Sequence, residues 1–192
     1  MESPVLMAET IIGGDVIRSC QEGDREAFRL LFENYKDRVF AIALYSLSGD
    51  ETAANDVTQQ IFLKLMKSIN QYRGESEFTT WLYRMVVNAC TDEHRRRRRF
   101  LPWGEPNLSK VSEKRPQQEK HFEGVELSAA LRKAIRELRP KFRLPILLKY
   151  IEGLSYEQIA AVLNCSKGTV ASRLNRGHKQ LAIRLAYLKD RL

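Results

Sequence analysis

The chain has 192 residues, of which 43% are hydrophobic and 29% are charged, and its formal net charge at pH 7 is +8. This apolar content can build packed cores, so the composition excludes an intrinsically disordered chain. The longest apolar runs are a few residues, far short of the roughly 20 that a membrane-spanning helix needs. The N-terminus has no secretory signal pattern. We therefore expect a soluble, cytoplasmic protein of one or two domains.

The charge is distributed unevenly along the chain. Residues 1–93 carry −6, residues 94–99 carry +5, residues 100–126 carry −1 and residues 127–192 carry +10. We call residues 94–99, in which His94 precedes five arginines, the arginine block. The basic parts indicate contacts with nucleic acid, whereas the acidic first part needs another explanation.

Residues with catalytic or metal-binding chemistry show no recognisable arrangement. The three cysteines and three histidines are scattered, and Cys20, Cys90 and Cys165 form no C-x-x-C pair. Paired carboxylates, a nucleophile elbow and a phosphate-binding glycine loop are all missing from the sequence. We therefore expect no metal, no cofactor, no disulfide framework and no enzyme activity.

Three amphipathic helices are predicted before residue 100. The first begins after Asp24, a plausible N-cap, and residues 48–50 end it and can cap the next helix. The third helix begins near Phe78, after a loop over residues 70–76, and runs into the arginine block. Apolar residues recur at helical spacing in all three helices. The stripe of the second helix consists of Val57, Ile61, Phe62, Leu65 and Ile69.

Residues 100–126 are rich in proline, glycine and polar side chains, which predicts a flexible linker. A second helical unit begins near Leu127, with one face formed by Leu127, Leu131, Ile135 and Leu138. Pro140 suits the first turn of the following helix. Pro145 would delete a backbone hydrogen bond inside that helix, at a cost of about 3 kcal/mol. We therefore expect the helix to start later or to kink there.

The C-terminal third contains a predicted helix-turn-helix. Ser155 and Gln158 form a capping-box pattern at the start of its first helix. Residues 164–166 make a short turn, and Ser166 can cap the second helix, whose Val170 and Leu174 point inward. The outer face of that helix is rich in cations and hydroxyl groups, which suit contacts with phosphates and base edges. The alternative is an αα-hairpin that only packs, with a solvated basic face.

Six motifs follow one another in a recognisable order, with Asn88 and the arginine block between the fourth and the fifth. They are residues 23–28 (GDREAF), 56–62 (DVTQQIF), 72–74 (YRG), 78–84 (FTTWLYR), 153–160 (GLSYEQIA) and 168–174 (GTVASRL). In this order the chain resembles the extracytoplasmic-function (ECF) group of bacterial RNA polymerase sigma factors, from about Cys20 to Leu185. The resemblance implies an all-α fold of two small helical domains: a sigma region 2 helical bundle at 20–99 and a sigma region 4 helix-turn-helix at 127–192. An N-terminal extension at 1–19 and the linker at 100–126 complete the division.

The resemblance also implies three sets of functional residues. The surface that grips the clamp helices of the largest polymerase subunit would consist of Asp56, Gln59, Gln60 and Phe62. The −10 element, with one base flipped from the stack, would be read and held by Tyr72, Arg73, Ser76, Arg84, Asn88, Arg95 and Arg96. The −35 element would be bound in the major groove by Lys167, Thr169, Ser172, Arg173, Arg176 and Lys179.

Several of these residues have a purely structural alternative. Phe62 and Trp81 lie on apolar stripes and can be core residues. Asp56 can cap or pair locally, and Asn88 is a polar residue in an otherwise apolar helix. The arginine block can be a solvated helix end, although five adjacent cations repel one another unless an anion compensates them.

Three positions depart from the usual ECF pattern. Gln60 stands where the group generally has Glu, so a neutral contact would replace a charged one. Ala171 stands where Lys or Arg is common, so neighbouring residues would have to make more of the −35 contacts. This puts the preferred −35 sequence in doubt. The third departure is Pro145.

The resemblance implies that the chain is a sigma factor, with core RNA polymerase, through its clamp helices and flap, promoter DNA and an anti-sigma factor as partners. A free-standing helix-turn-helix regulator that binds an operator as a dimer is the alternative. Such a regulator needs neither a clamp-binding helix nor a −10 loop. A signalling enzyme with a DNA-binding tail is disfavoured because the sequence shows no catalytic constellation.

Overall fold

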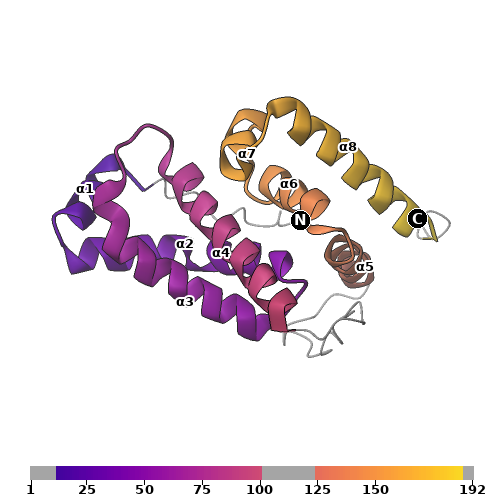
Figure 1. Ribbon diagram of the computed structural model, residues 1–192, viewed down its shortest axis with the longest axis horizontal. Helices are drawn as coiled ribbons and strands as arrows, with labels where there is room; N and C mark the ends of the chain where they lie inside the picture. Colours follow the sequence, from indigo (N-terminus) through magenta and orange to yellow (C-terminus); the bar gives the residue numbers. More distant parts are fainter. Residues whose placement is uncertain (1–11, 101–123, 188–192) are drawn as a thin grey trace.

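The computed structural model describes residues 12–100 and 124–187, and these residues form helices joined by turns and short loops, without strands (Figure 1). This confirms the predicted all-α fold. In chain order the elements are α1 (Gly14–Gln21), α2 (Arg25–Ser46), α3 (Glu51–Ser68), the 3₁₀ turn η1 (Ile69–Gln71), α4 (Phe78–Phe100), α5 (Gly124–Arg136), α6 (Pro140–Tyr150), α7 (Tyr156–Leu163) and α8 (Lys167–Arg184).

The first half is a bundle of α2, α3 and α4. Its helix starts are fixed by two predicted caps: the Asp24 carboxylate accepts from the backbone N–H groups of Glu26 and Ala27, and that of Asp50 accepts from Ala53. All five residues of the predicted α3 stripe are buried. Full burial of one such side chain stabilises a fold by about 1.5–3 kcal/mol.

Helix α1 was not among the predicted helices, and it begins inside the segment assigned to an N-terminal extension. It buries Ile17 and Cys20 and packs against α2 and η1. The Gln21 amide donates to the carbonyls of Ile69 and Tyr72, at 3.0 and 2.9 Å. This helix therefore supports the start of the loop that leads to α4.

The second half contains the predicted helix-turn-helix in α7 and α8. Ser155 and Gln158 form both bonds of the capping box. Asn164 ends α7 in the left-handed conformation, at φ 47°, and the Ser166 hydroxyl accepts from Thr169 N–H to cap α8. Helix α8 crosses close to α6 at Gly177, where a Cβ would lie 2.6 Å from Ile146 Cδ1.

Two expectations for the second half need correction, and a third, the linker, is mostly untested. Helix α5 begins at Gly124, earlier than the predicted Leu127, and Leu131 on its expected inner face is 40% exposed. Helix α6 does not start late: it begins at Pro140, and Pro145 lies buried within it. The linker expected at 100–126 falls mostly outside the described residues.

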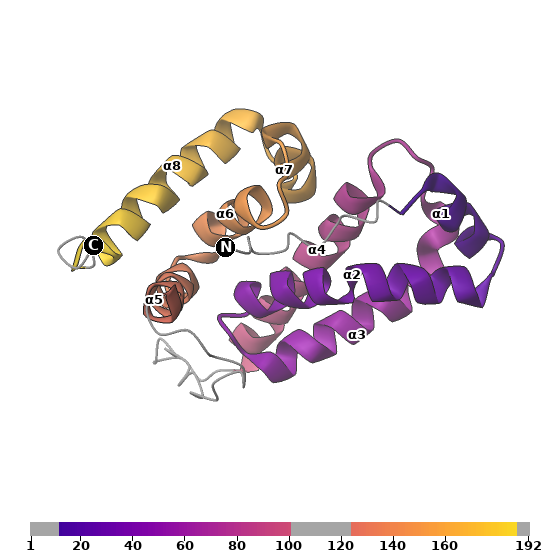
Figure 2. The ribbon, with the colours of Figure 1, turned by 180° about the vertical axis from the view of Figure 1, so that it is seen from behind.

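The two halves pack against each other. Helix α4 contacts α7, α2 contacts α6, and buried apolar residues of both halves form one continuous cluster (Figures 1 and 2). Helix α8 lies at the outer edge of the molecule, on the side away from α3. The two domains are therefore distinct in sequence and in local packing, but they contact each other directly.

Candidate nucleic-acid and protein interfaces

The outer face of α3 carries the residues predicted to bind polymerase. Asp56, Gln59 and Gln60 are exposed at the spacing that places side chains on one side of a helix. Phe62 is only 5% exposed and packs edge-on against Phe32, with ring centroids 4.7 Å apart. Phe62 is therefore a core residue, as its structural alternative predicts, and its burial does not fit a direct contact with a partner.

Two apolar residues missed by the sequence analysis extend this surface. Leu63 is 54% exposed and Met66 is 56% exposed, and they continue the row of Gln59 and Gln60 along the helix. Their position outside the buried stripe of α3 is the signal that could have identified them. We call the exposed residues on this side of the helix the α3 face. They are Asp56, Gln59, Gln60, Leu63 and Met66.

The loop before α4 is held by an aromatic cluster. Tyr72 packs against Phe78 and Trp81, with ring centroids 5.4 and 5.5 Å away, and its hydroxyl donates to the Ser76 carbonyl at 2.7 Å. Gly74 turns the loop at φ 74°, in the left-handed region that glycine tolerates best. Because Tyr72 and Trp81 remain partly exposed, the loop presents aromatic surface on which a base can stack.

Helix α4 continues this surface with two polar side chains. Arg84 and Asn88 are both exposed and lie one helical turn apart. Asn88 faces solvent, so a role in the core does not explain why this apolar helix has a polar residue here. Arg84 Nε donates to the Ala161 carbonyl of α7 at 3.1 Å, so this predicted DNA contact is engaged with the other half of the chain.

The arginine block continues α4, and its first three arginines have acidic partners. Arg95 lies 3.5 Å from Asp92, and Arg96 lies 2.8 Å from Glu93. Arg97 pairs with Glu93 at 2.8 Å and with Asp50 at 2.9 Å. The predicted DNA contacts Arg95 and Arg96 remain exposed, whereas Arg97 joins the block to the cap of α3.

Helix α8 presents a basic face to solvent. Lys167, Ser172, Arg176 and Lys179 are exposed, whereas Thr169 and Arg173 are half-buried. Lys167 Nζ pairs with Glu157 at the start of α7, and this hydrogen bond holds the pKa of Glu157 below its usual range. Within residues 12–100 and 124–187, Arg173, Arg176 and Lys179 form no ion pair. This unneutralised charge suits a phosphate backbone.

Residues 12–100 and 124–187 contain no group of three or more metal-ligating side chains. No helix in the same ranges is long and apolar enough to cross a membrane.

Comparison with known proteins identifies both halves. Residues 31–100 match Sigma-70 region 2, and residues 128–181 match Sigma-70, region 4. These matches, in this order, define a sigma factor of the sigma-70 type. The ECF RNA polymerase sigma-E factor of Haemophilus influenzae is 32% identical over 184 residues, which cover 91% of this chain and 96% of that protein. The chain therefore belongs to the ECF family of RNA polymerase sigma factors.

Further similarities agree with this assignment. The sigma-E factor of Escherichia coli strain K12 is 32% identical over 184 residues, covering 91% of this chain and 95% of that protein. The ECF sigma factor SigE of Mycolicibacterium smegmatis is 38% identical over 157 residues, or 81% of this chain, which spans 60% of that protein's length.

Two solved structures share the fold. CnrH, in a complex with the cytosolic domain of CnrY, has a TM-score of 0.65 at 23% identity and covers 90% of this chain and 96% of its own. The sigma factor RpoE of Bartonella quintana, in a complex with the anti-sigma factor NepR, has a TM-score of 0.66 at 24% identity and covers 83% and 96%.

Proposed function

We propose that the chain binds core RNA polymerase and directs it to promoters by reading a −10 and a −35 element itself. The observation that carries this proposal is the presence, in one chain, of region 2 followed by region 4. A dimeric operator-binding regulator has no use for region 2. In this scheme the polymerase supplies the chemistry of transcription, and this chain supplies the specificity and the strand-opening contacts.

We assign the α3 face to the clamp helices of the largest polymerase subunit. Its exposed Leu63 and Met66 provide apolar area, and Asp56, Gln59 and Gln60 provide hydrogen-bonding groups. An apolar patch bordered by polar side chains is typical of a surface that binds protein. This assignment explains why the first half of the chain, at −6 for residues 1–93, is acidic although the whole protein is basic.

We assign the loop at 72–76 and the exposed face of α4 to the non-template strand of the −10 element. The Tyr72 and Trp81 rings can stack on an extruded base, and Arg73, Ser76 and Asn88 can hydrogen-bond to it. Arg84 belongs to the same surface when it is released from Ala161. Arg95 and Arg96 would hold phosphates next to the strands as they separate.

We assign α8 to the major groove at the −35 element. In a helix-turn-helix the second helix enters the groove, and residues near its N-terminus contact base edges. That end of α8 carries Lys167, Thr169, Ser172 and Arg173. Further along the helix, Arg176 and Lys179 would lie toward the phosphate backbone of the DNA. The polymerase flap would hold this domain at a fixed distance from the −10 element.

We also propose an anti-sigma factor as a regulatory partner and the cytoplasm as the place of action. Both rest on membership of the ECF family, since core polymerase and promoter DNA occur together in the bacterial cytoplasm. The anti-sigma factor would have to cover at least one of the three assigned surfaces in order to block initiation.

Run-off transcription tests the proposed function. Core polymerase should give a specific transcript from templates chosen by mapping 5′ ends after overexpression, and only when this chain is added. A double change of Leu63→Asp and Met66→Asp should abolish the gain by removing core binding. Leu30→Asp, at an exposed leucine on α2 that is outside the α3 face, is the matched control. No added transcript with the wild-type chain would refute the proposal.

A further inference from the structure

The 72–76 loop is held at its start by a side chain from the N-terminal part of the chain. Gln21, the last residue of α1, donates through Nε2 to the carbonyl oxygen of Ile69 at 3.0 Å and to that of Tyr72 at 2.9 Å. A side-chain amide has two N–H groups, so these two carbonyls use both of them. Ile69 begins η1, and Tyr72 follows its last residue. The Gln21 amide therefore fixes the point at which the chain leaves α3 and enters the loop.

Gln21 is carried by a short helix that is itself fixed in place. Ile17 and Cys20 of α1 are buried, at 7% and 6% exposed. The turn from α1 to α2 is tight, because Gly23 adopts φ 91°, in the left-handed region, and Asp24 already caps α2. The position of the Gln21 backbone is therefore set by the packing of α1 against α2 and η1.

Tyr72 passes this restraint on to the rest of the loop. Its carbonyl belongs to the same planar peptide unit as the N–H of Arg73, so the bond from Gln21 orients the backbone from which Arg73 extends. At the other end of the residue, the Tyr72 hydroxyl donates to the Ser76 carbonyl at 2.7 Å. Tyr72 is thus anchored to α1 and closes the loop at the same time.

The tip of the loop can meet DNA on this fixed base. Arg73, Gly74 and Glu75 are exposed, and within residues 12–100 and 124–187 the Arg73 side chain has neither a hydrogen bond nor an ion pair. Ordering a backbone segment on binding costs conformational free energy. A loop whose start is already held therefore loses less entropy when a base binds than a loop that must be ordered at both ends.

We propose that Gln21 is a positioning residue for the −10 element and that α1 takes part in promoter opening through it. In this role the amide holds the 72–76 loop in the shape that receives an extruded base. The match to Sigma-70 region 2 covers residues 31–100, so it assigns no function to α1. The inference rests on the proposed function of the loop and adds a residue that does not touch DNA itself.

The two carbonyl acceptors make the residue type at position 21 important. Gln21→Met has a side chain of similar length but no N–H group, so it removes both hydrogen bonds without adding charge. Gln21→Glu keeps the shape of the side chain, but an ionised carboxylate only accepts and would face the oxygens of Ile69 and Tyr72. Both changes should free the start of the loop, and Gln21→Glu should have the larger effect.

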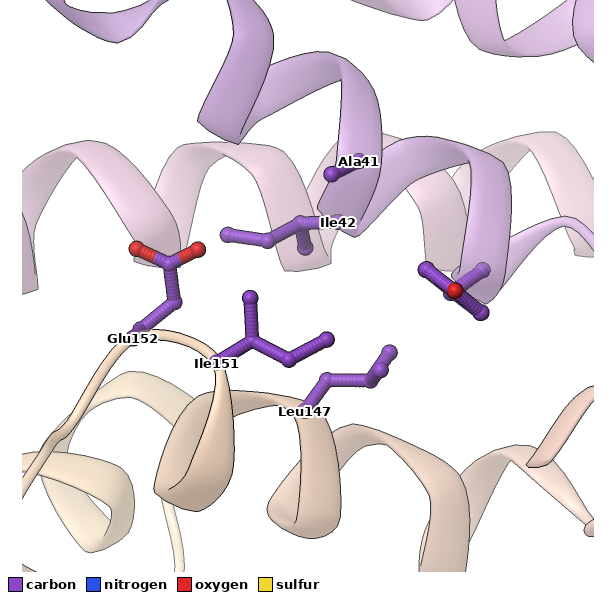
Figure 3. Close-up of a pocket in the computed structure, with 6 residues that line it drawn as sticks. Ala41, Ile42, Leu147, Ile151 and Glu152 are labelled. Atoms are coloured by element: carbon purple, nitrogen blue, oxygen red, sulfur yellow. The ribbon is translucent and has the colours of Figure 1, made fainter. Parts of the chain in front are cut away.

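The control variant weakens the same half of the protein without touching the loop. Ile42 lies near the end of α2 that is far from α1 and is 2% exposed. It lines a shallow apolar notch between α2 and the end of α6, beside Ala41 and Leu147 (Figure 3). Ile42→Val removes one buried carbon atom, a change that typically causes a small loss of stability. Urea titration of all variants shows how closely the losses match.

The experiment measures the affinity of the holoenzyme, formed by core polymerase and the full chain, for fluorescent fork-shaped templates. Each template has a duplex −35 element and a single-stranded non-template −10 element from a promoter mapped by its transcript 5′ end. A matched set of templates has one abasic nucleotide at successive −10 positions. For wild type, the position with the largest loss of affinity marks the extruded base. The ratio of the affinities for the intact template and for that abasic template measures recognition of this base.

For Gln21→Met this ratio should fall about three- to tenfold, the range expected for the loss of one or two hydrogen bonds, and it should fall further for Gln21→Glu. Affinity for the abasic template should stay close to the wild-type value, because that template lacks the base that the loop receives. Ile42→Val should leave the ratio unchanged, since a smaller fraction of competent protein lowers both affinities equally.

The outcomes separate this inference from the proposed function. An unchanged ratio for Gln21→Met, while wild type distinguishes the two templates, overturns the positioning role. An equal fall of the ratio for Ile42→Val also overturns it, because the effect would then follow from stability. If wild type loses no affinity at any abasic position, or gives no specific transcript with core polymerase, the proposed function itself fails and the inference fails with it.

Discussion

The two cationic surfaces of this sigma factor differ in how their charge is balanced. In the arginine block, Arg96 and Arg97 pair with Glu93, and Arg97 also pairs with Asp50. On α8, Arg173 and Arg176 form no ion pair within the described residues. The described arginines of the block therefore have acidic partners, whereas the two α8 arginines would be available to an external phosphate.

We expect this difference to affect the strength of DNA binding. An arginine that leaves a carboxylate for a phosphate exchanges one favourable contact for another, so its net gain is smaller than that of an unpaired arginine. Burial raises the pKa of Glu93, but hydrogen bonds from Arg97 and Arg96 outweigh it and leave the pKa below its usual range. Glu93 therefore stays ionised at neutral pH and would compete with DNA for Arg96 and Arg97. We expect α8 to dominate the electrostatic part of binding.

The largest effect should come from the unpaired arginines. Arg173→Ala and Arg176→Ala should each cost about 1–3 kcal/mol of binding to −35 duplex and relax the preference at one base pair, if the residue reads a base. Uniform weakening across sequences would mark a phosphate contact instead. Arg184→Ala, on the same helix but 3.5 Å from Glu137, is the control. The comparison fails if Arg184→Ala costs as much as either change.

Asp50 links the arginine block to the stability of the fold. Asp50→Ala removes the α3 cap and should lower the free energy of unfolding by about 1 kcal/mol at neutral pH. Asp50→Asn keeps a good cap and loses only the charge opposite Arg97, so its loss should be smaller. Urea titration of the three proteins measures both values. A larger loss for Asn than for Ala would contradict the capping role.

The same residue predicts a pH dependence. The hydrogen bond from the Ala53 N–H is the main cause that lowers the pKa of Asp50; burial opposes it and Arg97 adds to it. A carboxyl with a lowered folded pKa stabilises the fold above its unfolded pKa of about 4, and this contribution disappears as pH falls through the folded pKa. The gap in unfolding free energy between wild type and Asp50→Ala should therefore shrink below about pH 4. A constant gap down to about pH 3 would contradict this explanation.

The salt dependence of DNA affinity also tests the difference between the arginine block and α8. Each phosphate contact adds about 0.9 to the log–log slope of affinity against salt. Replacing Arg95 and Arg96 by Gln should flatten the slope by a total of less than about 1, because Asp92 and Glu93 already neutralise part of their charge. An unchanged slope would make the block a solvated helix end. A loss of about 1.8 would mean that its carboxylates do not compete with DNA at all.

The smallest expected effect is a gain in affinity for promoter DNA. Glu93→Gln keeps a hydrogen-bond acceptor for Arg96 and Arg97 but removes the competing charge, so affinity for promoter DNA should rise about two- to threefold at low salt, within the range for a single exposed pair. Glu26→Gln, which removes the partner of Arg29 on α2, should change nothing. Filter binding of both variants measures this, and a loss of affinity for Glu93→Gln would show that Glu93 orients the arginines for DNA.

Features fixed by neighbouring residues were predictable from the sequence. The caps at Asp24, Ser155 and Ser166 were predicted and are confirmed, and Asp50 is the cap within the predicted segment 48–50. A cap needs only a side chain two or three residues from the N–H it accepts from. The burial of Val57, Ile61 and Leu65 followed from helical periodicity for the same local reason. The exposure of Leu63 and Met66 on α3 could also have been predicted, because both residues fall outside that periodicity.

Features that depend on distant parts of the chain were missed. Helix α1 is eight residues long, too short to be stable by itself, and it is fixed by Gln21 reaching the carbonyls of Ile69 and Tyr72. The bond between Tyr83 and Glu152 joins residues 69 positions apart, so no local pattern reports it. Pro145 was expected to delay the start of α6 or to kink it; the helix begins at Pro140 and contains Pro145, which is buried.

In the proposed function, this chain holds two DNA-binding surfaces at one fixed separation on polymerase. Run-off transcription with core on a pair of templates, identical except for five base pairs added between the −35 and −10 elements, tests it most directly. Five base pairs rotate one element by about half a turn relative to the other. The longer template should lose the specific transcript. Equal transcription from both templates would contradict it.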